Sequence, residues 1–486
     1  MTASPKSEIA AEVVVIGSGP GGSVTATLCA EAGKSVLMIE EGRHLALESA
    51  PHFSQQEILQ KYRSAGVTVA LGNSSIAYVE GRCVGGGSEI NRGLYFRTPD
   101  YLLQEWRTAF AVEDLTETSL RPHFEACEST ARVEYLPGDA PPMSRRLFQG
   151  AQRLGWAAVE APRLYAYGAS GAPGRKQSMS ETFVPRFLAA GGRLITDTFA
   201  VRLIRSDWKW RVLASQANGS GAKRQIEILA DHVFVACGAV QTPALLRRSG
   251  ITRNVGNSLR FHPMVKVVAA FDDEVNDPES FDPVHQIKQF EPSFSMGCSI
   301  SKPHMLALAM VDHPDHINEI KHNWRRMAIY YVQNSSGRAR VRHIPSLRDP
   351  IVTVAQTPAN LAQLAEGLRR LIEALFAGGA RVIYPSLPGY PVLRSRAELD
   401  CLPQTLLPSV CNATSVHVFS SCPMGEHARC ATDSFGRVKG ADGLYIADAS
   451  LLCGPTVVNP QGTVMAIAHR NALHAIDRQF RARAPS

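Results

Sequence analysis

Long apolar runs and blocks of like charge are both missing from this 486-residue sequence. No window holds the ~18 consecutive apolar residues typical of a membrane-spanning helix, and the N-terminus has no apolar signal core. The formal net charge of +7 is spread along the chain, with basic blocks no longer than pairs such as Arg145 and Arg146. The sequence therefore predicts a cytoplasmic protein without an integral membrane segment and without a nucleic-acid groove.

Metal-ligand spacings are also missing. The ten cysteines are scattered and none forms a CxxC pair, which favours small buried thiols in a reducing compartment. His313, Asp315, His316 and His322 lie close together in the sequence, but their spacing matches neither a helix face nor a strand face. A polar loop is the better interpretation of this cluster, and no metal site is predicted.

The composition is that of a globular enzyme, with 45% hydrophobic and 20% charged residues. A chain of this length exceeds what one hydrophobic core holds, so two or three domains are expected. Such a chain can bury a large cofactor.

Residues 12–42 read as a strand, a glycine turn, a helix and a second strand. An apolar run ends directly before Gly17, and GxGxxG continues through Gly19 and Gly22. Gly17 allows the tight turn, Gly19 lets the backbone approach a pyrophosphate, and Gly22 lets the helix lie close to the strand. A second apolar strand over residues 35–39 ends in Glu40, about 20 residues after the turn, where a carboxylate can accept from ribose hydroxyls. The stretch predicts a dinucleotide site.

The middle of the chain gives weaker patterns. Residues 194–207, 210–214 and 232–237 read as strands, with a helix over 241–248. Residues 327–333 and 338–342 flank a Ser-Ser-Gly turn and predict a β-hairpin in an antiparallel sheet. Leucines recur at helical spacing between Thr357, a predicted cap, and Gly378, so a helix packed on that sheet is favoured over a helix on a membrane surface.

The C-terminal part carries polar residues in apolar surroundings. His417 alternates with Val416 and Val418, as on a strand that presents an imidazole on one face. Asn459 precedes Pro460 and a helical pattern, so it is well placed to cap that helix. Taken alone, a core histidine and a helix cap are the ordinary interpretations of these two residues.

Several stretches together resemble the glucose-methanol-choline (GMC) family of flavin oxidoreductases. The resemblance is carried by VVVIGSGPGGS and IEEG near the N-terminus, RCVGGGSEINRGLYFR, GAVQTPALLRRSGI, NVGNSLRFHP, SGRARVRHIPSLRDP, HVFSSCPMG, GLYIADAS and VVNPQGTVMAIA. It implies an α/β fold with a Rossmann-like FAD-binding domain, whose parallel sheet is covered by helices, and a substrate-binding domain with a largely antiparallel sheet.

The resemblance also implies how the chain is divided. FAD-binding segments are expected at residues 1–98, 185–264 and 404–486, and substrate-domain segments at 99–184, which includes a lid, and 265–403. Nothing in residues 285–323, which should line the substrate cavity, matches the family residue by residue.

Cofactor contacts follow from the matched positions. The resemblance places Val201 at the adenine, Ser88 and Asn91 at the isoalloxazine ring, and Asp448 with Ala449 beside the ribityl chain and pyrophosphate. The remaining positions expected to contact FAD are Gly17, Gly19, Gly22, Glu40, Glu41, Asn459, Pro460 and Gln461. Some relatives bond the flavin covalently through a histidine at the position of Ile90, so non-covalent FAD is expected. Arg92 stands where many relatives have a small residue, and its role is open.

His417 and Asn459 match the active-site pair of the family. Oxidising an alcohol requires a base for the hydroxyl proton and an acceptor for the hydride at flavin N5. His417 is the expected base, and Asn459 is expected to hold the same oxygen. The resemblance thus implies oxidation of a primary or secondary alcohol to an aldehyde or ketone, with a weak lean toward a hydrophobic or steroid-like alcohol. Oxygen, a quinone or a carrier protein would accept the electrons.

Two other interpretations stay open. A non-redox lyase or a photodecarboxylase-like member of the same family is one, although His417 counts against the photodecarboxylase type. A flavin-binding protein without turnover is the other.

Overall fold

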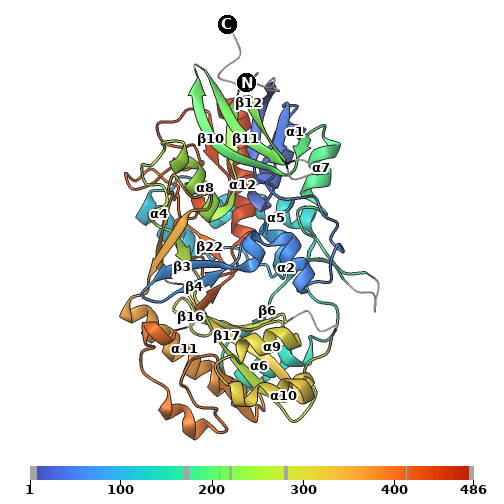
Figure 1. Cartoon of the computed structure of the whole chain (residues 1–486), viewed down its shortest axis with the longest axis vertical. Helices are drawn as coiled ribbons and strands as arrows, with labels where there is room; N and C mark the ends of the chain where they lie inside the picture. Colours follow the sequence, from blue (N-terminus) through green and yellow to red (C-terminus); the bar gives the residue numbers. More distant parts are fainter. Residues whose placement is uncertain are drawn as a thin grey trace.

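Two sheets organise the chain in a computed structural model that describes residues 8–168, 174–206, 208–217, 222–278, 283–335, 337–411 and 413–480. In Figure 1 the first sheet lies in the upper part, where the blue N-terminal and red C-terminal segments meet. The second sheet extends into the lower part, where α6, α9, α10 and α11 gather around β16 and β17. The predicted α/β class is confirmed.

The seven-stranded sheet is built around β1. Its order is β10-β11-β12-β1-β2-β9, with β23 also paired to β12, and the pairs from β12 through β9 are parallel. The strands are β1 (Glu8–Ile16), β2 (Val36–Ile39), β9 (Arg193–Ile195), β10 (Thr198–Ser206), β11 (Lys209–Ala217), β12 (Lys223–Val235) and β23 (Leu444–Ile446). Strands β1 and β2 lie in the middle of this sheet and are covered on both faces, which explains why their sequences are continuously apolar.

The eleven-stranded sheet is mostly antiparallel. Its order is β18-β19-β3-β4-β21-β14-β17-β16-β15-β6, with β20 paired to β14. The strands are β3 (Thr68–Gly72), β4 (Ile76–Tyr78), β6 (Ala158–Glu160), β14 (Met264–Ala270), β15 (His285–Ile287), β16 (Phe294–Cys298), β17 (Met327–Asn334), β18 (Arg338–Arg342), β19 (Ile351–Ala355), β20 (Val382–Pro385) and β21 (Ala413–Ser415). Strands β3, β4 and β21 come from segments expected to bind FAD, and the division into domains stays a prediction.

The predicted hairpin is wrong. Strands β17 and β18 form where expected, but β17 pairs with β14 on one edge and β16 on the other, so it has no edge left for β18. Strand β18 pairs with β19 instead, and the bridge between Leu259 and Ala339 adds a second neighbour. Ser336 of the expected turn lies outside the described residues.

Twelve α-helices are described, and helix α11 confirms the leucine pattern. It starts with a capping box between Thr357 and Asn360, ends at Gly378, and packs on β14, β16 and β17. The helices are α1 (Pro20–Glu31), α2 (Gln55–Lys61), α3 (Gly87–Ile90), α4 (Asp100–Phe110), α5 (Glu117–Ala131), α6 (Pro142–Arg153), α7 (Phe183–Ala189), α8 (Gly238–Arg248), α9 (Pro303–Ala309), α10 (Ile317–Asn323), α11 (Pro358–Ala377) and α12 (Gln461–His474). Short strands β5 (Val133–Glu134), β7 (Arg163–Ala166) and β8 (Arg175–Lys176) form a small sheet, and β13 (Arg260–Phe261) pairs with β22 (Val418–Phe419).

The histidine cluster near residue 313 is not a loop. It forms a 3-10 turn over Pro314–His316 followed by α10, and His313 is buried with Nε2 at 2.7 Å from the carbonyl oxygen of Pro385. Among the described residues, no group of three or more His, Cys, Asp or Glu side chains is placed to hold a metal ion. The described helices also include none long and apolar enough to cross a membrane.

Candidate active site and cofactor cradle

The glycine turn between β1 and α1 is shaped by its neighbours. Gly17 has a φ of +103°, and a Cβ there would lie 2.3 Å from the carbonyl oxygen of Ala236. A Cβ on Gly22 would lie 2.1 Å from the carbonyl oxygen of Gly17, so the helix approaches the strand as predicted. Gly19 differs, because a Cβ there would meet nothing within 4 Å. Open space at the start of α1, where N–H groups lack helical acceptors, suits a phosphate.

The glycine-rich loop after Arg82 closes on this turn. Gly85 donates its N–H to Ser18 Oγ at 3.1 Å, and a Cβ on Gly86 would lie 3.0 Å from the Cα of Gly19. Ser88 is buried and donates to the carbonyl oxygen of Gly85 at 2.7 Å while it accepts from the N–H of Met179 at 3.0 Å. The loop therefore contacts the glycine turn itself.

The loop end at Asn91 is tied to the C-terminal segment. Asn91 Nδ2 donates to Gln461 Oε1, and Asn91 Oδ1 accepts from the N–H of Gly93 at 3.0 Å. Ile90 is buried, and the guanidinium of Arg92 lies 5.1 Å from the ring centre of Phe53. The predicted isoalloxazine loop and the start of α12 thus lie side by side.

Glu40 ends β2 beneath the turn. Its carboxylate accepts from the N–H of Ser18 at 3.0 Å, from Ser18 Oγ at 2.8 Å and from the N–H of Gly42 at 2.9 Å. Burial raises the pKa of Glu40, and these hydrogen bonds partly offset that effect. The glycine turn therefore helps to hold the Glu40 carboxylate in place.

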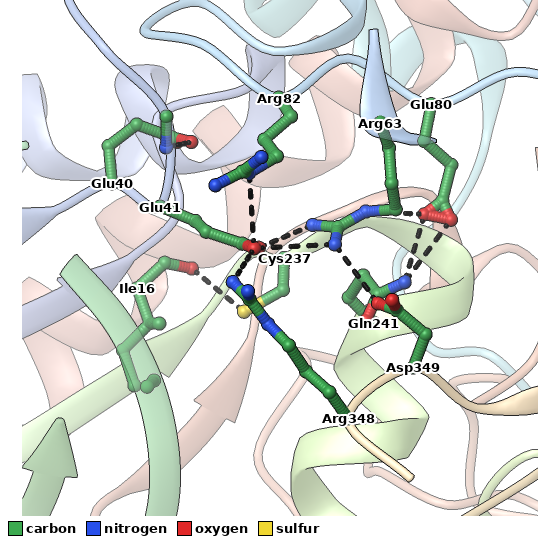
Figure 2. Close-up of polar contacts among 12 residues, drawn as sticks. Ile16, Glu40, Glu41, Arg63, Glu80, Arg82, Cys237, Gln241, Arg348 and Asp349 are labelled. Atoms are coloured by element: carbon green, nitrogen blue, oxygen red, sulfur yellow. Dashed lines mark hydrogen bonds and ion pairs between the residues drawn. The ribbon is translucent and has the colours of Figure 1, made fainter. Parts of the chain in front are cut away.

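Glu41 lies inside an arginine cage that Figure 2 shows. Its carboxylate pairs with Arg63, with Arg82 at 3.2 Å and with Arg348 at 2.6 Å, and these charges keep its pKa low despite burial. Arg63 also reaches Glu80 and Asp349. The cage joins three separate stretches of sequence around the end of β2.

Val201 borders a cavity of about 370 Å³ near this cage. Phe199, Arg248 and Arg348 are among the lining residues. The carbonyl oxygen of Val201 accepts from Arg248 Nε at 3.1 Å, so the backbone group expected at the adenine already has a side-chain partner.

Asp448 follows β23 and is buried. Its carboxylate accepts from the N–H of Ser450 at 2.8 Å, from the N–H of Gly238 at 2.9 Å and from Thr242 Oγ1. Because a Cβ on Gly21 would lie 2.0 Å from the carbonyl oxygen of Ala447, the start of α1 touches this strand end. Asp448 therefore fixes the backbone around Ala449 beside the glycine turn.

These features fit FAD. The open space at Gly19 and the carboxylate of Glu40 would hold the pyrophosphate and ribose, and the cavity at Val201 would take the adenine. Ser88 and Asn91 would border the ring system.

His417 lies directly before β22, so the predicted strand over residues 416–419 is shorter than expected. Val416 is 55% exposed and forms no aliphatic face. His417 itself is half-buried, and burial lowers its pKa to about 4, with the positive charge of Lys288 adding to the effect. His417 is therefore a neutral imidazole near pH 7.

Asn459 is not a helix cap. Helix α12 has Pro460 at its N-cap and no side-chain hydrogen bond there. The Asn459 side chain turns away, with Nδ2 at 3.3 Å from His417 Nε2 and Oδ1 accepting from Gln286 Nε2 at 3.2 Å. Tertiary partners outcompete the local capping preference that the sequence suggested.

His262 contacts His417, Gln286 contacts Asn459, and the sequence analysis missed both His262 and Gln286. His262 is 1% exposed and its Nδ1 lies 2.9 Å from His417 Nδ1. Because Asn459 donates to His417 Nε2, the ring proton of His417 stands on Nδ1 and is donated to His262. The LRFHP stretch that contains His262 stood out in the sequence, but its neighbouring residues did not show that His262 contacts His417.

Comparisons with known proteins agree with this geometry. Models of the family described as GMC oxidoreductase match residues 21–264 and 333–468. An uncharacterised GMC-type oxidoreductase of Sinorhizobium fredii is 34% identical over 99% of this chain and 97% of its own.

More distant relatives have named activities. A long-chain-alcohol oxidase of Arabidopsis thaliana is 26% identical over 97% of this chain and 69% of its own. The crystal structure of pyridoxine 4-oxidase from Mesorbium loti superposes with a TM-score of 0.74 at 18% identity, over 98% of this chain and all of that one, so the two share a fold.

Proposed function

Since this chain belongs to the GMC oxidoreductase family of FAD-dependent enzymes, we propose that it oxidises a primary or secondary alcohol to an aldehyde or ketone. The long-chain-alcohol oxidase relative supports oxidation at a CH–OH group. Oxygen, a quinone or a carrier protein would take the electrons, and the cytoplasm stays the expected compartment.

The observation that carries this proposal is a proton acceptor beside a proton donor. His417 Nε2 is unprotonated, and the amide Nδ2 of Asn459 lies 3.3 Å from it. A hydroxyl entering between them donates its proton to His417 and accepts from Asn459. Both groups then act on one oxygen atom, as removal of the hydroxyl proton requires.

Bound FAD supplies the hydride acceptor for the carbon atom. His262 accepts from His417 Nδ1 and so keeps the lone pair of Nε2 turned toward Asn459. Gln286 donates to Asn459 Oδ1 and orients the amide so that Nδ2 meets the substrate. His417 holds the abstracted proton while the carbonyl product forms.

We also propose non-covalent FAD. Ile90 lies in the loop that would contact the flavin, is buried, and offers no nucleophile. Acid precipitation should release all FAD into the supernatant, and yellow colour in the washed pellet would contradict this.

An anaerobic titration of the holoenzyme with primary and secondary alcohols tests the proposed activity. We expect bleaching of the oxidised flavin absorbance by at least one alcohol, with an equivalent amount of aldehyde or ketone formed. His417→Ala should bind FAD and lose this bleaching. Product formation from a carboxylic acid only under illumination, or no bleaching by any alcohol, would contradict the proposal.

A further inference from the structure

One face of the eleven-stranded sheet is apolar and covered. Helix α11 packs on β14, β16 and β17, while α6 packs on β15 and β16. Alternate residues of these strands fill that core: Val265, Val267, Ile287, Phe294, Met296, Tyr330 and Val332. The intervening residues therefore point to the opposite face.

The opposite face is polar along the same four strands. Strand register places Gln286 opposite Gly297, Gly297 opposite Tyr331, and Tyr331 opposite Lys266. The next row contains Ser295 paired with Gln333, and Gln333 Nε2 donates to Ser295 Oγ at 3.3 Å. Buried polar side chains thus replace the aliphatic residues that a steroid or alkyl chain would prefer.

This polar face adjoins the active site. Gln286, at one end of the first row, donates to Asn459. Gly297 has no side chain, and the Tyr331 hydroxyl leans over it, 2.4 Å from where a Cβ would stand. Further along the same face, Val268 and Ile329 are covered by α9. The part of the face that α9 leaves uncovered therefore runs from Gln286 to Lys266.

Lys266 has no partner on this face. Among the described residues, none forms a hydrogen bond or ion pair with its ammonium group, and burial alone lowers its pKa. Lys288, by contrast, pairs with Glu291 at 2.6 Å. Lys266 is half-buried on this polar face, and a positive charge that protein largely surrounds and that no carboxylate among the described residues offsets can attract an anion.

We propose that Lys266 binds a carboxylate of the substrate, so that the alcohol oxidised at His417 carries an acid group remote from its reacting carbon. This inference rests on the proposed alcohol oxidation. Three strand spacings separate Lys266 from Gln286, or about 14 Å. The lysine side chain spans part of that distance, which leaves room for a hydroxy acid of moderate length.

The test compares ω-hydroxyhexanoate with hexanol in anaerobic flavin reduction. The wild-type enzyme should prefer the hydroxy acid by at least ~30-fold in reduction rate per substrate concentration, the effect of one buried charge pair. Lys266→Met should abolish that preference and leave hexanol unchanged. Lys266→Arg should retain most of it, and Lys321→Met, at an exposed position on α10, should behave as wild type.

A binding measurement makes the result independent of turnover. Hexanoate, which has the carboxylate without the hydroxyl, should perturb the flavin absorbance of the wild type and bind at least ~30-fold more weakly to Lys266→Met. The melting temperature of the variant should not fall, because the Lys266 ammonium has no hydrogen-bond or ion-pair partner among the described residues to lose.

Three results separate the possible failures. Equal reduction by both alcohols, or equal hexanoate affinity in wild type and Lys266→Met, would overturn the carboxylate subsite while alcohol oxidation stands. Failure of every alcohol to bleach the flavin would overturn the proposed function. Hexanoate binding that depends on Lys266 would still support the subsite in that case.

Discussion

Buried polar groups have different numbers of hydrogen-bond partners in two regions of the molecule. One region is the cofactor cradle, which consists of the glycine turn after β1, Glu40, Glu41 and Asp448. The other is the His417 centre, which consists of His417, Asn459, His262 and Gln286. In the cradle, the carboxylates of Glu40, Glu41 and Asp448 each have three partners among backbone N–H groups, hydroxyls and arginines. In the centre, His262 Nε2 and Gln286 Oε1 are buried and have no hydrogen-bond partner in the part of the chain that the structure describes. Among the described residues, the amide of Asn459 is the only hydrogen-bond partner of His417 Nε2.

Under the proposed function, the cradle binds the cofactor and the centre carries out the reaction, and the difference in hydrogen bonding suits these two roles. A cradle whose carboxylates are already held in place is rigid before the cofactor arrives. A centre with unused hydrogen-bonding capacity can accept a substrate hydroxyl without first breaking a strong interaction. Mutations in the cradle should therefore change FAD binding, whereas mutations in the centre should change the rate of flavin reduction.

The largest expected effect is at the cradle, in Gly19→Val. The space around Gly19 is open, so the side chain should fit the fold and fill the volume that the pyrophosphate needs. We expect folded apoprotein, measured as the ratio of FAD to protein together with the circular dichroism spectrum. Ala32→Val, at the exposed end of α1, is the matched control and should retain FAD. Full FAD content in Gly19→Val would contradict the assignment.

A smaller effect is expected at the centre, in Asn459→Ala. Loss of the amide donor should slow anaerobic flavin reduction roughly 10- to 100-fold while FAD content and melting temperature stay near wild type, since Asn459 does not cap α12. Asn459→Asp should instead place a negative charge beside His417 and raise its pKa. Asn323→Ala, exposed on α10, controls for a general effect. A drop in stability without a change in rate would favour a purely structural role.

The smallest effect is expected at the rim of the cradle, in Arg348→Met. Glu41 keeps Arg63 and Arg82, and Arg348 is 45% exposed, so the free energy of unfolding should fall by less than ~1 kcal/mol. Urea titration at low and high salt measures this change. Loss of FAD from Arg348→Met would show that residues 343–349 hold the cofactor, and these residues would then belong to the cradle.

The cradle was predictable because its determinants are local. Gly17, Gly19 and Glu40 lie on one strand-turn-helix-strand stretch, and β1, α1 and β2 formed within a few residues of their predicted bounds. The centre depends on contacts far apart in sequence. His262 and His417 are 155 residues apart, and the amide of Asn459 turned from its local cap toward Gln286, 173 residues away.

Strand pairing shows the same limit. Residues 327–333 and 338–342 were recognised as strands from their own sequence, but their partners were decided by β14, β16 and β19. The polar face that carries Lys266 also emerges only from this register, because alternation within one strand does not show which face meets the active site.

The central claim is that His417 acts as a neutral base, and the pH dependence of anaerobic flavin reduction tests it most directly. Burial lowers the pKa of His417 from 6.5 to about 4, so the base is lost only as pH falls through about 4. The same shift predicts that folding stability falls as pH drops from 6.5 toward 4, so brief pH jumps in a stopped-flow instrument are required. We expect a rate that is flat above pH 5 and decreases around pH 4 in the wild type, and a rate at least ~10²-fold slower without that step in His417→Ala. A wild-type transition near pH 6.5 or above, or His417→Ala reduced at the wild-type rate, would contradict the account.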